Sequence, residues 1–475
     1  MRRFSFLLVI SLFSSVQLAA QTDEDAFQIK KIFDTSLTEG KAYDWLYDLT
    51  HNVGARLSGS PGAAAAVEFG KQVFDTLGFD KVYLQECMVP HWERGEPEVV
   101  KVVNSETMGS VDLNALALGF SGATGPAGLT AEVIKVNSLE ELRALDDAAV
   151  AGKIVFFNGP MDPTQVNTFS AYGGAVGQRS RGPRESAQKG AVGAVVRSMT
   201  LKLDDVPHSG GTNFEDVAPI PALAISTKAA NLLSTLVDNE PVRLYLRTTC
   251  KRLSDKVSYN VVGEITGREF PDEIILVGGH LDSWDVSQGA HDDGAGCVQS
   301  MDVIHIFNLI GYKPKRTLRC VLFMNEENGQ EGAKVYTNTS NANNEHHIAA
   351  LESDRGGFTP RGFTTEGHDE TYKDLIKQAK RWDVLLQPYG LIINAGGGSG
   401  ADISRLRSQK GLLIGLLPDS QRYFDFHHAA NDNFDKVNKR ELQLGAGAMT
   451  ALIYLIDHYG LTPGADTGTH KGKKK

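Results

Sequence analysis

The sequence predicts an α/β protein whose main domain has three layers, α/β/α, around a mixed sheet that is parallel at its centre. Short apolar runs, such as residues 274–277 and 412–417, alternate with longer helical patterns in the C-terminal half. Apolar runs without polar alternation are typical of strands that helices cover on both faces. A glycine-rich stretch, residues 113–247, interrupts this alternation and indicates an inserted second domain.

The first part of the main domain, residues 21–112, is expected to begin with helix. Residues from 21 to about 52 place Trp45, Leu46 and Leu49 on one helical face. A Ser-Gly-Ser-Pro-Gly turn then introduces a second helix. That helix is expected at 63–77, and strands are expected at 82–85 and 99–103.

The insert, residues 113–247, is expected to be rich in strands. Short β-like runs occur at 153–157 and 222–225, and one helix is indicated at 185–188. The insert has no cluster of His, Asp and Glu at ligand spacing. We expect it to form a lid or rim over the site, or a dimer contact, rather than a spacer that only adds surface.

The second part of the main domain, residues 248–465, is expected to alternate strands with helices. The expected strands are 274–277, 318–324, 348–352 and 412–417, and the expected helices are 294–309, 370–382 and 442–459. The last residues, 466–475, end in lysines and are expected to be disordered.

The first twenty residues have the pattern of a secretory signal peptide. Arg2 and Arg3 precede a largely apolar run at 4–13 that is too short to cross a bilayer, and small residues end at Ala20. Cleavage near Ala20 predicts an exported protein, whether periplasmic, secreted or extracellular. No later run reaches eighteen apolar residues, so no membrane span is expected.

The charge and the cysteines exclude several classes of protein. The formal net charge is −10, and removing two arginines with the signal leaves −12, which disfavours binding to nucleic acid or anionic membranes. The four cysteines have neither a disulfide-scaffold pattern nor zinc-ligand spacing. Two of them lie in apolar patterns, which favours buried free thiols, but the sequence does not decide the pairing of Cys87, Cys250, Cys297 and Cys320.

Metal-binding residue types follow three successive expected strands of the main domain. His280 follows the first strand, Glu326 and Glu327 follow the second, and Asp354 follows the third. In open α/β sheets, sites form where the strands end at their carboxyl side. We therefore expect these side chains to meet at one edge of the sheet.

Two more carboxylates, Asp292 and Asp293, precede an expected helix in a glycine-rich stretch. Alone, they are equally compatible with helix capping. Beside the strand-end residues they would repel their neighbours unless cations neutralised them, which favours divalent metals. Imidazole and carboxylate suit zinc, and paired ions about 3.5–4 Å apart can share one bridging carboxylate. A Glu that is not a ligand can then take the proton of the attacking water.

These residues belong to motifs that resemble the co-catalytic zinc exopeptidases, the aminopeptidase family that includes the glutamate carboxypeptidases. The motifs are HLDSWDVSQGAHDDGAG at 280–296, NEENGQEG at 325–332, ESDRG at 352–356, GGGSGADIS at 396–404 and FHH at 426–428. They are similar to the plasma glutamate carboxypeptidase branch over nearly the whole mature chain. The resemblance implies an insert similar to a protease-associated domain, short peptide or dipeptide substrates, and a homodimer.

The resemblance also implies which residues bind two zinc ions per chain. His280 and Asp354 resemble the ligands of one zinc, and Glu327 and His428 resemble those of the other. Asp292 matches the carboxylate that bridges the two ions. The second imidazole has an alternative, because His427 is adjacent to His428. Asp432 stands four residues after His428, which is the family spacing, so His428 is preferred.

Other residues match catalytic and supporting positions of the family. Glu326 matches the general base, and Asp282 matches a carboxylate that orients the imidazole of His280. Asp293 matches the residue that follows a cis peptide bond. Ser399 and Gly400 lie in a glycine-rich loop that lacks the lysine of a phosphate-binding loop, so we expect a substrate-site loop.

The leading hypothesis is a dipeptidase or carboxypeptidase, although the ligand pattern does not reveal which end of a peptide is recognised. A broad-specificity aminopeptidase is the enzyme alternative. A metal-free binding ectodomain is the non-enzyme alternative, and a single-zinc glutaminyl cyclase of the same fold is a third. The number of bound metal ions would separate these possibilities.

Overall fold

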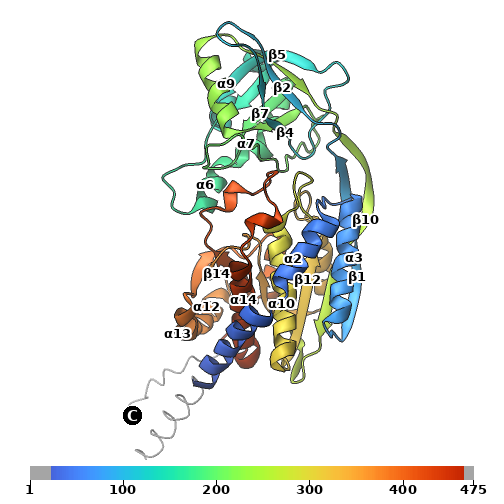
Figure 1. Ribbon diagram of the computed structural model, residues 1–475, viewed down its shortest axis with the longest axis vertical. Coiled ribbons are helices and arrows are strands. Elements are labelled where there is room, and N and C mark those ends of the chain that lie inside the picture. Colours follow the sequence, from blue (N-terminus) through green and yellow to red (C-terminus); the bar gives the residue numbers. More distant parts are fainter. Residues whose placement is uncertain (1–22, 465–475) are drawn as a thin grey trace, which may run out of the picture.

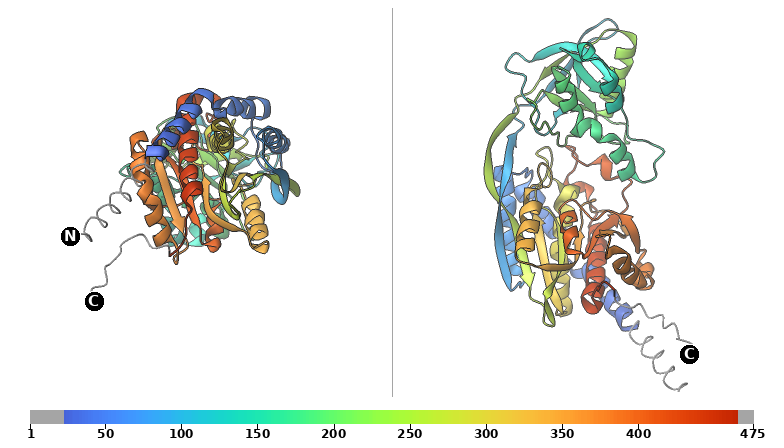
Figure 2. Two further views of the ribbon diagram at one scale, coloured as in Figure 1. Left: turned by 90° about the horizontal axis from the view of Figure 1, so that it is seen from below. Right: turned by 180° about the vertical axis from the view of Figure 1, so that it is seen from behind.

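The computed structural model describes residues 23–464, so the expected signal peptide and the lysine-rich tail lie outside the described chain. Two eight-stranded sheets organise these residues. The first sheet is in the lower part of Figure 1, and the second, built from the middle of the chain, is above it. The view from behind in Figure 2 shows the same arrangement.

The first sheet is mixed and parallel at its centre, as the sequence predicts. Its strand order is β1-β10-β12-β11-β13-β16-β14-β15. The four parallel central strands are β12 (Arg316–Phe323), β11 (Phe270–His280), β13 (His346–Glu352) and β16 (Leu412–Pro418). The flanking strands are β1 (Lys81–Glu93), β10 (Lys251–Ile265), β14 (Pro360–Gly367) and β15 (Ile392–Gly397).

Helices cover both faces of this sheet because its central strands are apolar on both faces. Ile275 and Val277 of β11 belong to one buried cluster, and Leu276 between them belongs to the opposite one. Every residue of β12 is buried. One face is covered by α2 (Ala42–Asp48), α3 (Pro61–Thr76), α10 (Ala295–Ile310) and α14 (Lys439–Tyr459), and the other by α11 (Glu331–Ala342).

The remaining helices of the first domain lie near the expected positions. A helix at residues 23–39 precedes α2. Helix α3 begins two residues earlier than expected, where the Ser60 side chain accepts a hydrogen bond from the amide of Ala63. The expected helix at 370–382 is present as α12 (Tyr372–Ala379) and a short 3₁₀ turn, followed by α13 (Asp383–Leu386).

The second sheet begins before the expected boundary at residue 113. Its strand order is β3-β2-β9-β5-β6-β7-β8-β4, so β2 (Val99–Ser105) and β3 (Gly109–Leu113) already belong to it. The other strands are β4 (Ala115–Ala117), β5 (Leu129–Val136), β6 (Ile154–Phe157), β7 (Gly193–Arg197), β8 (Ala222–Ile225) and β9 (Arg243–Arg247). The strand expected at 99–103 was therefore assigned to the wrong sheet.

The insert has more helix than the sequence pattern predicts. Buried clusters lie on both faces of its sheet, and each cluster includes residues from helices. The helices are α4 (Leu139–Ala144), α5 (Asp147–Val150), α6 (Thr168–Ala175), α7 (Gly177–Ser180), α8 (Gly182–Gln188) and α9 (Thr227–Asn239). The insert is thus an α/β unit in its own right, with β5, β6, β7 and β8 parallel.

Buried polar contacts hold the insert against the first domain. Arg94, in the segment that leads into the insert, donates to both oxygens of Asp285, at 2.9 and 2.6 Å, and to Glu98 at 3.0 Å. Its guanidinium also reaches the carbonyl of Ala117 at 2.6 Å. The amide of Ser209 donates to the carbonyl of His428 at 2.8 Å, which fixes the insert to the end of the first sheet.

All four cysteines are buried free thiols, which confirms the interpretation of Cys297 and Cys320. In residues 23–464, no helix combines the length and apolar character needed to cross a bilayer.

The Arg94 cluster gives a prediction about stability. Arg94→Met should lower the free energy of unfolding by about 3 kcal/mol, because it leaves two partly buried carboxylates without their cation. Urea denaturation followed by circular dichroism measures this change. Arg361→Met is the control, since Arg361 pairs with Asp419 on the exposed surface and such pairs contribute little. An equal loss of unfolding free energy in both variants would contradict the proposed contribution of the Arg94 cluster to stability.

Candidate metal centre

The side chains predicted from three strand ends meet at one edge of the first sheet. His280 is the last residue of β11, Glu327 follows β12 and Asp354 follows β13. Because these strands are parallel, their carboxyl ends share that edge. The Nε2 atom of His280 lies 3.3 Å from Asp292 Oδ1 and 3.4 Å from Asp354 Oδ1. His280, Asp292 and Asp354 form one group whose ligand atoms could hold a metal ion.

A second group forms around the other oxygen of Asp292. The Nε2 atom of His428 lies 3.3 Å from Asp292 Oδ2 and 3.0 Å from Glu327 Oε2. His427, Asp292 and His428 form the second group whose ligand atoms could hold a metal ion. His427 stacks on His428 with ring centroids 3.5 Å apart, but its Nε2 lies 3.9 Å from Asp292 Oδ2. The two groups therefore share Asp292, one oxygen each, which is the arrangement of a bridging carboxylate.

Unpaired buried atoms indicate that the groups fit metal ions. Asp292 Oδ2 and Glu327 Oε1 are buried and accept no hydrogen bond. Buried acceptors without donors are rare in native proteins because they are costly to desolvate. Cations among these atoms would satisfy them. Imidazole nitrogens and carboxylate oxygens are donors that suit zinc.

Burial and mutual repulsion control protonation at the site. Burial, together with the carboxylates of Asp354 and Asp282, raises the pKa of Glu326 to about 7 against the opposing effect of His280. Burial also raises the pKa of Glu327 well above its usual range. Burial acts in the same direction on Asp292, but the imidazoles of His280 and His428 hold the pKa of Asp292 low. Cations bound here would favour the ionised carboxylates.

Asp282 has a different role from the one expected. The Nδ1 atom of His280 lies 3.0 Å from the main-chain carbonyl of Asp282, whereas the carboxylate is 3.9 Å away. That carboxylate instead accepts the amides of Asn325 at 2.7 Å, Glu326 at 3.0 Å and Glu327 at 3.4 Å. Asp282 thus orients the imidazole through its main chain, and its side chain positions the two glutamates.

Asp293 and Asp432 hold the backbone on either side of Asp292. The Asp292–Asp293 peptide bond is cis, as the resemblance implies. Asp293 accepts the amides of His280 at 3.1 Å and Gly296 at 2.9 Å. Asp432 accepts the amide of Asp292 at 3.1 Å and that of His291 at 2.8 Å.

The glycine-rich loop contacts two carboxylates of the first domain. The Ser399 hydroxyl donates to Glu366 at 2.6 Å. Gly400 packs against the carboxylate of Glu352, where a Cβ atom would lie 2.2 Å from Cδ. Neither residue lines the two cavities described below. The loop thus supports the buried Glu352, and its contact with substrate stays a prediction.

Two arginines near the site are absent from the sequence-based predictions. Arg56 is fully buried and donates to the carbonyls of Leu281, Gln288 and Gly289 at 2.6, 2.6 and 2.8 Å, which fixes the loop after His280. Arg179, from α7 of the insert, lies with Nη1 3.4 Å from His428 Nδ1. Single arginines have no spacing signal, so only the fold reveals their position.

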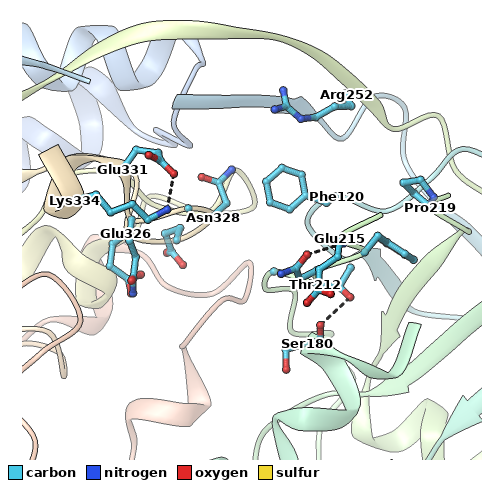
Figure 3. A pocket seen from close by; sticks show the side chains of 16 residues that line it. Phe120, Ser180, Thr212, Glu215, Pro219, Arg252, Glu326, Asn328, Glu331 and Lys334 are labelled. Carbon is cyan, nitrogen blue, oxygen red and sulfur yellow. Dashed lines mark hydrogen bonds and ion pairs between the residues drawn. The ribbon is translucent and has the colours of Figure 1, made fainter. Parts of the chain in front are cut away.

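Two adjacent cavities open at the site. The metal cavity, of about 300 Å³, is bordered by the ligand candidates other than His280 and by insert residues that include Tyr172 and Arg179. The side cavity, of about 620 Å³, lies beside it and appears in Figure 3. Glu326, Glu327 and Gly211 border both cavities. The insert thus supplies part of the wall, as expected for a rim.

Sequence comparisons identify related proteins. The model of peptidase family M28 matches residues 260–453. Carboxypeptidase Q of Bos taurus is 33% identical over 420 residues, which cover 88% of this chain and 85% of the relative. Carboxypeptidase Q of Homo sapiens is 33% identical over 421 residues, with the same shares covered.

Solved structures give the same result for the fold. A peptidase M28 precursor from Shewanella amazonensis SB2B has a TM-score of 0.86 and 31% identity, covering 93% of this chain and 99% of that one. BSAP, a zinc aminopeptidase from Bacillus subtilis, has a TM-score of 0.62 and 17% identity, and the match covers 87% of this chain and 94% of BSAP. The second comparison concerns the fold alone.

Proposed function

This chain belongs to peptidase family M28, and we propose that it is an exported di-zinc exopeptidase of the carboxypeptidase Q type. It is a metallopeptidase, and its proposed substrates are short peptides, above all dipeptides. The observation that carries this proposal is the shared position of Asp292 between two imidazole–carboxylate groups. Export rests on the first twenty residues of the sequence.

The proposed ligands divide between two zinc ions. His280 and Asp354 would hold one ion, Glu327 and His428 would hold the other, and Asp292 would bridge them. His428 is preferred to His427 because its Nε2 is nearer to Asp292, at 3.3 rather than 3.9 Å, and also contacts Glu327. Bound zinc would polarise the scissile carbonyl and lower the pKa of the attacking water.

Glu326 is the proposed general base. It borders the metal cavity but belongs to neither ligand group. Its raised pKa, about 7, suits a group that takes a proton and then releases it. Glu326 would accept the proton of the attacking water and deliver it to the leaving amine. Asp282 keeps Glu326 in place through the backbone amides that it accepts.

Arg179 favours recognition of a free carboxyl end. Its side chain is buried and borders the metal cavity. It donates to the Tyr172 hydroxyl at 2.6 Å and to the carbonyl of Ser209 at 3.3 Å, but no carboxylate in residues 23–464 forms an ion pair with it. A buried guanidinium without an anion is costly, and a substrate carboxylate would neutralise it through paired hydrogen bonds. This supports a carboxypeptidase or dipeptidase over the aminopeptidase alternative.

The insert supports a preference for short peptides, because it closes one side of the metal cavity with Phe169 and Tyr172. Its likeness to a protease-associated domain and a homodimeric assembly are further parts of the proposal. Both rest on the resemblance of the sequence motifs. The two groups of possible metal ligands, which share Asp292, disfavour the metal-free ectodomain and the single-zinc cyclase.

The adjacent glutamates should respond differently to substitution. Glu326→Gln should retain both zinc ions and lower kcat roughly 10²–10⁴-fold, because only the proton acceptor is lost. Glu327→Gln should also lose zinc, because it removes a ligand. Dipeptide hydrolysis and metal analysis by mass spectrometry measure both effects, with the exposed Glu370→Gln as control. Near-normal turnover of Glu326→Gln would refute this assignment of the base.

Arg179 gives a test of which peptide end is recognised. Arg179→Gln should raise KM roughly tenfold for a dipeptide with a free carboxyl group, because a charge-assisted hydrogen bond is lost. The KM for the same dipeptide with a carboxyl-terminal amide should change little. Zinc content is measured in parallel, since Arg179 lies beside His428. Arg181→Gln is the matched control, because Arg181 lines neither cavity. Equal losses on both substrates would contradict the assignment.

A further inference from the structure

The side cavity next to the metal cavity has no role in the account above. We propose that it binds the side chain of the residue released by hydrolysis and selects a large, uncharged side chain. This inference rests on the proposed function, since it assumes that Glu326 protonates the leaving amine. It adds the identity of the preferred leaving residue, which the ligand groups do not specify.

The side cavity has walls from both domains. The insert supplies Phe120, Phe214 and Pro219, and the first domain supplies the segment at 328–331 that follows the two glutamates. Figure 3 shows Phe120 and Pro219 across the gap from Asn328 and Glu326. At about 620 Å³, the cavity is within the usual range of ligand pockets. It therefore has room for a large side chain.

The position of Glu326 determines which part of the peptide enters this cavity. Glu326 and the adjacent ligand candidate Glu327 border both cavities, whereas Asp292, Asp354 and His428 border only the metal cavity. The scissile carbonyl must lie with the metal ligands. The leaving nitrogen must lie within hydrogen-bonding reach of Glu326. The residue attached to that nitrogen then continues past Glu326, away from the bridging Asp292, and towards the side cavity.

The position of Arg179 also indicates that the leaving residue extends towards the side cavity, without reference to Glu326. Arg179 borders the metal cavity and Ser180, the next residue, borders the side cavity. Gly211 borders both, so Arg179 lies near the junction of the two cavities. A carboxyl-terminal residue whose carboxylate pairs with Arg179 would place its side chain in the larger space beside it.

The charges on the wall favour an uncharged side chain. Lys334 pairs with Glu331 at 2.6 Å, Arg252 pairs with Asp255, and Glu215 pairs with Arg184. Apart from Glu326 and Glu327, which lie at the junction with the metal cavity, each charged residue at the rim thus already has an opposite charge, and a charged side chain entering the cavity would have to displace one. The rings of Phe120 and Phe214 offer apolar contact instead.

Dipeptide kinetics with the zinc-loaded full chain test this assignment. The kcat/KM values for Ala–Phe and Ala–Leu should exceed those for Ala–Gly, Ala–Glu and Ala–Lys roughly tenfold or more, because burial of a large apolar side chain is favourable. A preference that follows the amine-side residue instead, with Phe–Ala cleaved faster than Ala–Phe, would overturn the proposal.

Two variants test the cavity directly. Ser180→Phe should fill it and lower kcat/KM for Ala–Phe roughly tenfold more than kcat/KM for Ala–Gly, because glycine has no side chain to place there. Phe120→Ala removes one wall and should reduce the preference for Ala–Phe over Ala–Gly. The control is Phe27→Ala, because that ring is 69% exposed on the first helix.

The possible results distinguish failure of the side-cavity inference from failure of the proposed peptidase function. If all dipeptides are cleaved at similar rates, or if both cavity variants lower every substrate equally, the side cavity does not select the leaving residue, and the zinc chemistry stands. If the zinc-loaded chain cleaves none of the dipeptides, the proposed function fails and the inference fails with it.

Discussion

The repulsion between buried carboxylates at one edge of the first sheet is the constraint on which the rest of the site depends. Asp292, Glu326, Glu327 and Asp354 border the same small cavity, and Asp292 is buried. Only imidazoles and cations can offset so much negative charge in a medium of low polarity. Asp292 resolves this conflict by facing His280 with one oxygen and His428 with the other.

The surrounding structure holds those groups in place through the main chain. Arg56, Asp282, Asp293 and Asp432 all bond to backbone groups next to ligand candidates rather than to the ligand side chains. The insert is fixed to the same region, because Ser209 bonds to the carbonyl of His428. A domain that is far from the ligands in sequence can therefore contribute to substrate recognition. Arg179 and Phe120 reach the two cavities in this way.

The sequence predicted the central strands well, because buried parallel strands are apolar, and it identified polar strand-end residues that the fold brings together, although their roles as zinc ligands stay a prediction. It missed β10 entirely, because the first seven residues of that strand are exposed and include only two apolar side chains, Leu253 and Val257, so no buried apolar pattern marks its start. Pairing with β1 holds that segment in place. The role expected for the Asp282 carboxylate was wrong, and the contact of Ser399 with Glu366 was not predicted, since each depends on which neighbour the fold brings close. Arg179 had no signal at all, because one arginine in an insert resembles any other.

The central claim is that Asp292 bridges two zinc ions, and anomalous X-ray diffraction at the zinc edge tests it most directly. Crystals of the zinc-loaded protein should show two peaks about 3.5–4 Å apart. One peak should lie against His280 and Asp354, the other against Glu327 and His428, with one oxygen of Asp292 directed at each. A single peak, or two peaks of which only one contacts Asp292, would contradict the account.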